Sequence, residues 1–131
     1  MAEKPNLLLT FSAAAYFLVS VALIFTTEEL LGFAAAAGTV LEIALLQLLG
    51  AALFGLAMLN WMSRYSRTGG IFGRPLVVAN FANAFIATMM LVHLWREDRL
   101  STPLMCALVF YAALALAFGA KLFLPPRNTR P

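Results

Sequence analysis

Long apolar runs alternate with short polar segments along the chain. Four of the runs hold about 20 residues each, the length that a helix needs to cross a bilayer. None of them alternates apolar and polar residues as a half-exposed strand does. The pattern therefore predicts an all-α protein, a membrane-spanning four-helix bundle. We expect residues 1–131 to form a single domain with spans at about 7–26, 39–62, 76–95 and 104–124.

The composition supports a membrane environment. Hydrophobic residues make up 63% of the chain and charged residues only 11%, whereas about a quarter of the residues of a soluble domain are charged. The first apolar run is too long for a signal peptide, so we expect it to be retained as a helix. Cys106 is the only cysteine, which excludes an internal disulfide and a cysteine metal cluster. We expect it to be a small buried residue, with a reactive thiol as the alternative.

The basic residues predict the orientation. Four spans place both termini and the 63–75 loop on one side of the membrane. The other side carries Arg96 and Arg99. The first side carries the remaining seven of the nine basic residues, which are Lys4, Arg64, Arg67, Arg74, Lys121, Arg127 and Arg130. Because positive charge is enriched on the cytoplasmic side, we predict a multi-pass protein of the bacterial inner membrane with both termini in the cytoplasm. Trp61 and Trp95 then lie at opposite interfaces.

A short segment, "TEELLGFAAAAG" at residues 27–38, separates the first two spans. Thr27 followed by Glu28 and Glu29 is typical of a helix start, where acidic residues interact favourably with the helix dipole. Gly38 is suited to end such a helix. We therefore predict a short helix that lies in the outer interface, with a plain extension of the first span as the alternative.

Small and polar residues at helical spacing mark the expected contact faces, because helices in lipid associate through close packing and polar contacts. Each span has one such face. The predicted sets are Ser12, Tyr16 and Ser20; Ala51 and Gly55; Asn80, Ala84 and Thr88, flanked by Ala79, Asn83 and Ala87; and Ala113 and Ala117, flanked by Ala115 and Gly119.

Three amides lie near the cytoplasmic ends of the second and third spans, which the 63–75 loop makes neighbours. Asn60, Asn80 and Asn83 need hydrogen-bond partners, because an unpaired amide in hydrocarbon costs several kcal/mol. One interpretation is that they clamp the helices together. The other is that they join Arg64 and Arg74 in a pocket for an anionic headgroup or a small anion.

The loop between these spans contains "RTGGIFGRP". Gly69 and Gly70 permit a tight turn, and Pro75 suits the first turn of the next helix. The P-loop pattern GxxxxGK[ST] is absent. We interpret the loop mainly as a turn with topology-setting charges, and expect a lipid-phosphate contact at Arg64 and Arg74.

A second polar group lies toward the outer side. Glu42 enters the second span near its outer end and Gln47 follows one to two turns deeper, while His93 is the only histidine. An intramembrane carboxylate is costly and often functional, so these residues are a candidate ion or proton site. The alternatives are a helix-start charge at Glu42, contact with Arg96 or Arg99, and simple packing of His93.

The sequence indicates no catalytic machinery. It contains no nucleophile–base arrangement, and one histidine without an HExxH motif predicts no metal site and no haem. We therefore expect no enzymatic activity, no cofactor and no nucleic-acid partner.

The run "EELLGF … LLQLLGAALFGLAMLNWMSR … GGIFGRP", within residues 28–83, resembles a group of small bacterial four-helix membrane proteins of unassigned function. The resemblance implies the number of spans and carries no activity.

The sequence thus predicts an accessory or assembly subunit that packs with itself, as a homo-oligomer, or with larger membrane partners, surrounded by membrane lipids. The short extramembrane segments, which leave no room for a soluble domain, favour this role. Two alternatives stay open. One is a small oligomeric transporter or channel that uses Glu42 or the amides. The other is a lipid or hydrophobic-ligand binder with a tunnel lined by Tyr16, Gln47 and Tyr111.

Overall fold

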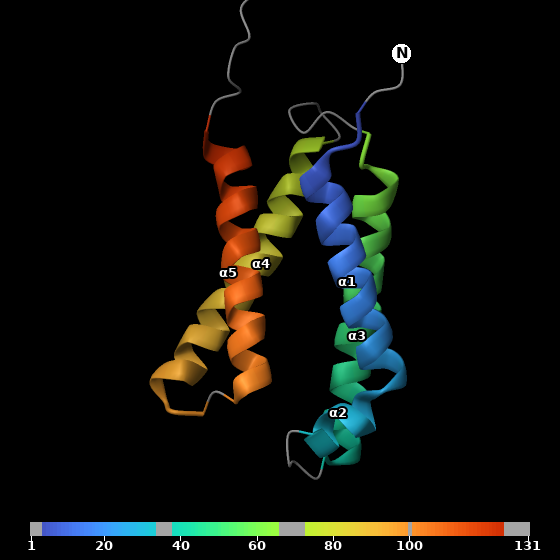
Figure 1. The fold of residues 1–131 in the computed structure, drawn as a ribbon, viewed down its shortest axis with the longest axis vertical. Helices are drawn as coiled ribbons and strands as arrows, with labels where there is room; N and C mark the ends of the chain where they lie inside the picture. The colour runs from blue at the N-terminus through green and yellow to red at the C-terminus, as the bar shows by residue number, and fades with distance from the viewer. Residues whose placement is uncertain (1–3, 34–37, 66–72, 100, 125–131) are drawn as a thin grey trace, which may run out of the picture. The chain divides into compact units, whose positions relative to one another are not determined.

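The structure, a computed structural model, describes residues 4–33, 38–65, 73–99 and 101–124 (Figure 1). Within these ranges the chain forms five helices and no strand: α1 (Leu7–Phe25), α2 (Thr27–Phe33), α3 (Val40–Met62), α4 (Gly73–Arg96) and α5 (Thr102–Phe123). All except α2 are long and apolar enough to cross a membrane. The predicted all-α fold with four membrane-spanning helices is confirmed. The chain divides into two compact units, Met1–Tyr65 and Ser66–Pro131, which are described in turn.

Local capping sets where the helices begin. The Asn6 side chain accepts a hydrogen bond from the Leu8 backbone N–H at 3.2 Å and caps α1. Thr39 caps α3 through a full capping box with Glu42, in which the threonine hydroxyl and the glutamate carboxylate each accept a backbone N–H. Pro75 lies in the first turn of α4 as predicted, where its missing N–H costs nothing.

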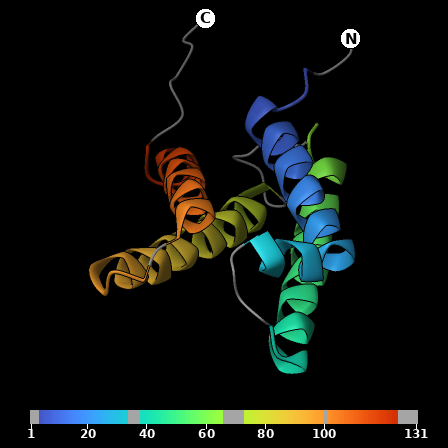
Figure 2. The ribbon, with the colours of Figure 1, turned by 60° about the horizontal axis from the view of Figure 1, so that its bottom comes forward.

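In the first unit, α1 and α3 run side by side (Figures 1 and 2). The predicted face of α1 is confirmed, because Ser12, Tyr16 and Ser20 are all fully buried. The buried residues of α3 are Gly50, Leu53, Ala57 and Asn60. A Cβ atom on Gly50 would lie 3.0 Å from the Leu23 Cβ and 3.1 Å from the Ser20 carbonyl oxygen. Gly50 therefore permits the close approach of the two helices.

The predicted contact face of α3 is wrong within this unit. Ala51 and Gly55 are exposed, and nothing lies within 4 Å of the position that a Cβ on Gly55 would take. Because α3 carries small residues on two opposite sides and is apolar all round, spacing alone did not identify the side that meets α1. Gly50 and Ala57 form the contact instead.

The short helix α2 is separate from α1, as predicted. The chain leaves α1 after Phe25, and Figure 2 shows α2 turned away from the α1 axis. Thr27 is buried, and its hydroxyl donates to the Leu23 carbonyl oxygen. This contact holds the first turn of α2 against the end of α1. A continuous extension of the first span is therefore excluded. The predicted end of α2 near Gly38 falls partly in residues 34–37, outside the described chain; α2 itself ends at Phe33. Its place in the membrane interface stays a prediction.

In the second unit, α4 packs against α5. Asn80 and Ala84 on the predicted face of α4 are fully buried. On α5, Gly119 is buried, whereas Ala113 is exposed. Phe81 fills the space over Gly119, since a Cβ there would lie 3.0 Å from its ring. Phe81 also stacks on Phe85 and meets Phe123 edge-on. An aromatic side chain against a glycine thus forms this contact, and the predicted alanine face of α5 is only partly used.

The end of α4 has a regular stop signal that the sequence did not reveal. Asp98 has a φ of 57°, in the left-handed region. The Arg99 N–H donates to the Leu94 carbonyl at 3.1 Å, and the Asp98 N–H donates to the Trp95 carbonyl at 3.1 Å. This is the Schellman arrangement, in which glycine is usual at the left-handed position. Aspartate tolerates that conformation better than most residues.

Candidate functional site

A buried amide joins α1 to α3. Asn60 is fully buried and its Nδ2 donates to the Ser12 Oγ at 3.0 Å. The Ser12 hydroxyl in turn donates to the Leu9 carbonyl oxygen at 3.1 Å. The first turns of α1 lie beside the last turns of α3, because neighbouring spans of a hairpin run antiparallel. This contact clamps α3 to α1, whereas the sequence predicted that Asn60 clamps the second span to the third; the predicted clamp stays a prediction.

Asn80 and Asn83 belong to the second unit. Asn80 is fully buried and its Nδ2 donates to the Leu76 carbonyl oxygen one turn earlier at 2.9 Å. Asn83 is half-buried. Arg74 is exposed in the first turn of α4. The five residues of the predicted headgroup pocket are thus divided between the two units, and the pocket as a whole stays a prediction.

Arg64 lies where the ends of α1 and α3 are tied together. Its carbonyl oxygen accepts the Asn6 backbone N–H at 2.7 Å. Its Nη1 donates to the Trp61 carbonyl oxygen at 2.8 Å. The guanidinium carbon lies 4.0 Å from the centroid of the Trp61 ring and 4.6 Å from that of Tyr65. These cation–π contacts hold the charge of Arg64 beside the aromatic residue expected at the membrane interface.

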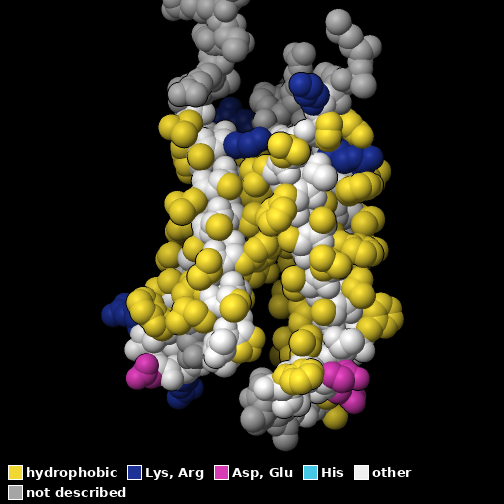
Figure 3. Space-filling view, viewed as in Figure 1, with side chains coloured by type: hydrophobic (Ala, Val, Ile, Leu, Met, Phe, Trp, Pro, Cys, Tyr) yellow, Lys and Arg dark blue, Asp and Glu magenta, His cyan; other side chains and the backbone are white. Residues whose placement is uncertain are grey.

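Among the described residues of the first unit, the charges are separated by sign. Figure 3 shows basic side chains at the end of this unit where α1 begins and acidic ones at its other end. The acidic residues at the second end are Glu28, Glu29 and Glu42. The side of the membrane on which each end lies stays a prediction from the basic residues.

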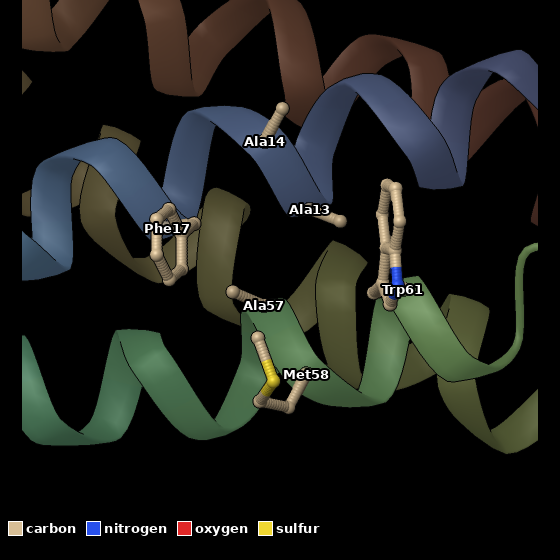
Figure 4. A pocket seen from close by; sticks show the side chains of 6 residues that line it. All are labelled: Ala13, Ala14, Phe17, Ala57, Met58 and Trp61. Atoms are coloured by element: carbon tan, nitrogen blue, oxygen red, sulfur yellow. The ribbon is translucent and has the colours of Figure 1, made fainter.

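An apolar groove opens between α1 and α3 next to Arg64. Its volume is about 320 Å³. Figure 4 shows the rings of Phe17 and Trp61 at its two ends, with Ala13 and Ala57 between them. The small side chains leave the space that the aromatic rings bound. The lining residues are Ala13, Ala14, Phe17, Ala57, Met58 and Trp61. The sequence analysis missed this groove. Its only trace in the sequence is a small residue on each helix: Ala57, one turn before Trp61 on α3, and Ala13 on α1.

Glu42 is held in the cap of α3. Its Oε2 accepts the Thr39 backbone N–H at 2.7 Å and the Thr39 hydroxyl at 3.1 Å. The carboxylate is exposed and stands at the positive end of the helix dipole. This geometry accounts for the presence of an acid here without a transport role. The ion or proton site remains a prediction.

A pair of substitutions separates the two interpretations of Glu42. Glutamine at this position of a capping box still accepts the threonine N–H, whereas alanine does not. We expect Glu42→Gln to keep slow hydrogen exchange at the first amides of α3 and Glu42→Ala to raise it. Proton flux into proteoliposomes should be the same for wild type and both variants. A flux that Glu42→Gln abolishes would contradict the capping role and support the proton site.

The other residues of the predicted outer site have local contacts. The Gln47 Nε2 donates to the Ile24 carbonyl oxygen at 3.4 Å and links α3 to the end of α1. The His93 Nε2 lies 3.3 Å from a carboxylate oxygen of Glu97, which follows directly after the end of α4. Both side chains of that pair are largely exposed, so the contact is weak. Glu42 and His93 lie in different units, and their pairing stays a prediction.

The described residues contain no group of three or more His, Cys, Asp or Glu side chains that could hold a metal ion. Cys106 is exposed on α5 rather than buried as expected. Comparison with known proteins adds no assignment: no family model matches the chain, and no curated protein and no solved structure matches it.

Proposed function

We propose that this small integral membrane protein is a non-enzymatic accessory or assembly subunit of the bacterial inner membrane. It packs with itself or with larger membrane proteins, with both termini in the cytoplasm. The four apolar helices and the short connections between them support this role. The distribution of basic residues supports the orientation.

The observation that carries the proposal is the open face of α3. Ala44, Leu48, Ala51 and Gly55 recur at spacings of three and four residues and are all exposed. They lie on the opposite side of α3 from Gly50 and Ala57, which meet α1. Three of the four, Ala44, Ala51 and Gly55, are small. Small residues let helix backbones approach closely, and close packing drives association in lipid. A second helix of a partner, or of another copy, fits this face.

The two glycines of α3 make the contrast sharp. A Cβ on Gly50 would meet three heavy atoms within 3.1 Å, whereas a Cβ on Gly55 would meet none within 4 Å. Glycine inside a helix costs up to about 1 kcal/mol relative to alanine. A contact with α1 explains that cost at Gly50. At Gly55 no contact within the α1/α3 unit explains it, and packing against a further helix would.

Assembly is tested on the full-length protein by native mass spectrometry from a mild detergent. We expect wild type to carry a second copy or a membrane-protein partner, and Gly55→Leu to lose it while its helical circular dichroism is unchanged. Gly32→Leu is the matched control, because Gly32 on α2 is equally open and lies outside the proposed face. A wild-type protein that is monomeric and unaccompanied would contradict the proposal. So would a Gly55→Leu variant whose fold collapses, since this face would then lie inside the monomer.

The transporter or channel alternative needs Glu42 or the amides on a water-filled path. Within the described residues, Glu42 binds Thr39 and Asn60 binds Ser12. These contacts support structural roles for both residues, so we place the transport function second.

A further inference from the structure

The groove between α1 and α3 needs an occupant in the membrane. It is open to the outside, apolar and bounded by Phe17 and Trp61. An unfilled space of this size loses the van der Waals contacts of all the atoms that line it. In a bilayer, an acyl chain or a protein side chain is suited to fill such an apolar space.

The dimensions favour an acyl chain over a helix. Phe17 lies one turn after Ala13 on α1, a rise of about 6 Å, and the two aromatic rings close the groove at its ends (Figure 4). A partner helix needs a contact face that runs over several turns. A single flexible hydrocarbon chain fits a short, bounded groove.

The charge beside the groove specifies the headgroup. The Arg64 guanidinium rests 4.0 Å from the ring centroid of Trp61, and that ring is one end of the groove. Its Nη1 is engaged by the Trp61 carbonyl, and a guanidinium has five N–H donors in all, arranged to suit a phosphate. Lys4 is also at this end but adjoins Glu3 in sequence, so Arg64 is the cation on which the argument depends.

We propose that Arg64 and this groove together bind one anionic phospholipid. The lipid phosphate accepts hydrogen bonds from the Arg64 guanidinium, and one acyl chain runs past Trp61 toward Phe17. A basic residue near an anionic membrane surface strengthens binding by about fivefold. The site therefore selects anionic over zwitterionic phospholipid by roughly that factor. This inference is independent of the assembly role, because it uses a different face of α3.

Trp61 is a reporter inside the site. The only other tryptophan is Trp95, so the full-length Trp95→Phe variant has a single fluorophore. It is reconstituted into vesicles of phosphatidylcholine and phosphatidylglycerol in which one lipid at a time carries brominated chains. Bromine quenches tryptophan on contact. From the quenching of Trp61 we expect an affinity for brominated phosphatidylglycerol about fivefold higher than that for brominated phosphatidylcholine.

Two substitutions and their controls test the two parts of the site. Arg64→Gln should bring the ratio of the two lipid affinities to about one, whereas Arg99→Gln, three residues after the C-terminal end of α4, should leave that ratio unchanged. Ala14→Phe should fill the groove and reduce quenching by both lipids, whereas Ala52→Phe, on the exposed side of α3, should not. An Arg64→Gln variant that keeps the preference would overturn the proposal, and so would equal effects of Ala14→Phe and Ala52→Phe. Inorganic phosphate that abolishes the preference would assign Arg64 to a free anion and overturn the lipid.

Discussion

Replacing Gly50 with leucine is expected to destabilise the α1/α3 hairpin by about 3 kcal/mol or more, at the upper end of the cost of overpacking. Even a single Cβ on Gly50 would lie 3.0 Å from the Ile24 Cγ1 and from the Leu23 Cβ. The third close atom is the Ser20 carbonyl oxygen at 3.1 Å, which is backbone and moves only with the whole of α1. A leucine therefore forces the two helices apart.

The measurement is unfolding of the purified protein in mixed micelles with increasing sodium dodecyl sulfate, followed by circular dichroism and tryptophan fluorescence. Gly55→Leu in the same helix is the control. It adds the same atoms where nothing lies within 4 Å, and it removes a glycine from a helix. Its stability should equal or exceed that of wild type in micelles that hold one chain each. Equal losses for the two variants would mean that α3 does not present Gly50 to α1.

The helices themselves were predictable because their signals are local. The predicted spans agree with the observed helices within three residues at every end. The length of the apolar runs predicted the four long helices, and Pro75 and the acids after Thr27 predicted the starts of α4 and α2. The cap at Thr39 was not predicted. The end of α4 at a left-handed Asp98 was not predictable, since glycine is the usual signal there.

The contact faces were predictable only where polarity marked them. Ser12, Tyr16 and Ser20 are polar residues on one side of an otherwise apolar helix, and that side is buried. On α3, small residues occur on both sides, and lipid provides no contrast between a face that meets a helix and one that meets hydrocarbon. Gly50 faces atoms of α1 and Gly55 does not, a difference that the sequence does not reveal.

The candidate sites depend on contacts between helices, and so the sequence identified their members without their partners. Asn60 was grouped with the amides of the next span, whereas the structure places Ser12 of α1 beside it. Arg64 was assigned to a lipid phosphate, but the groove that adjoins it requires Ala13 and Ala57 to face each other across two helices. Neither alanine carries a chemical signal of its own.

The contact between Asn60 and Ser12 should be measurable as a coupling energy. We expect a double-mutant cycle of Ser12→Ala and Asn60→Ala to give about 0.6–1.7 kcal/mol, the range from the average to the largest values for hydrogen bonds between membrane helices. Both side chains are fully buried and the donor–acceptor distance is 3.0 Å. Each single variant should be destabilised, and the double variant should lose less than the sum. The energies come from the same unfolding titration.

A second cycle of Asn60→Ala with Ser20→Ala is the control. Ser20 is as deeply buried as Ser12, but its hydroxyl donates to the Phe17 carbonyl oxygen in its own helix at 2.7 Å. It lies eight residues further along α1, about 12 Å away, so its effect should add to that of Asn60 within about 0.5 kcal/mol. Coupling at Ser12 alone would establish Asn60 as the clamp between α1 and α3 and weigh against its use in a headgroup pocket. No coupling at either serine would contradict the role of the Asn60–Ser12 contact as the polar anchor that aligns α1 with α3.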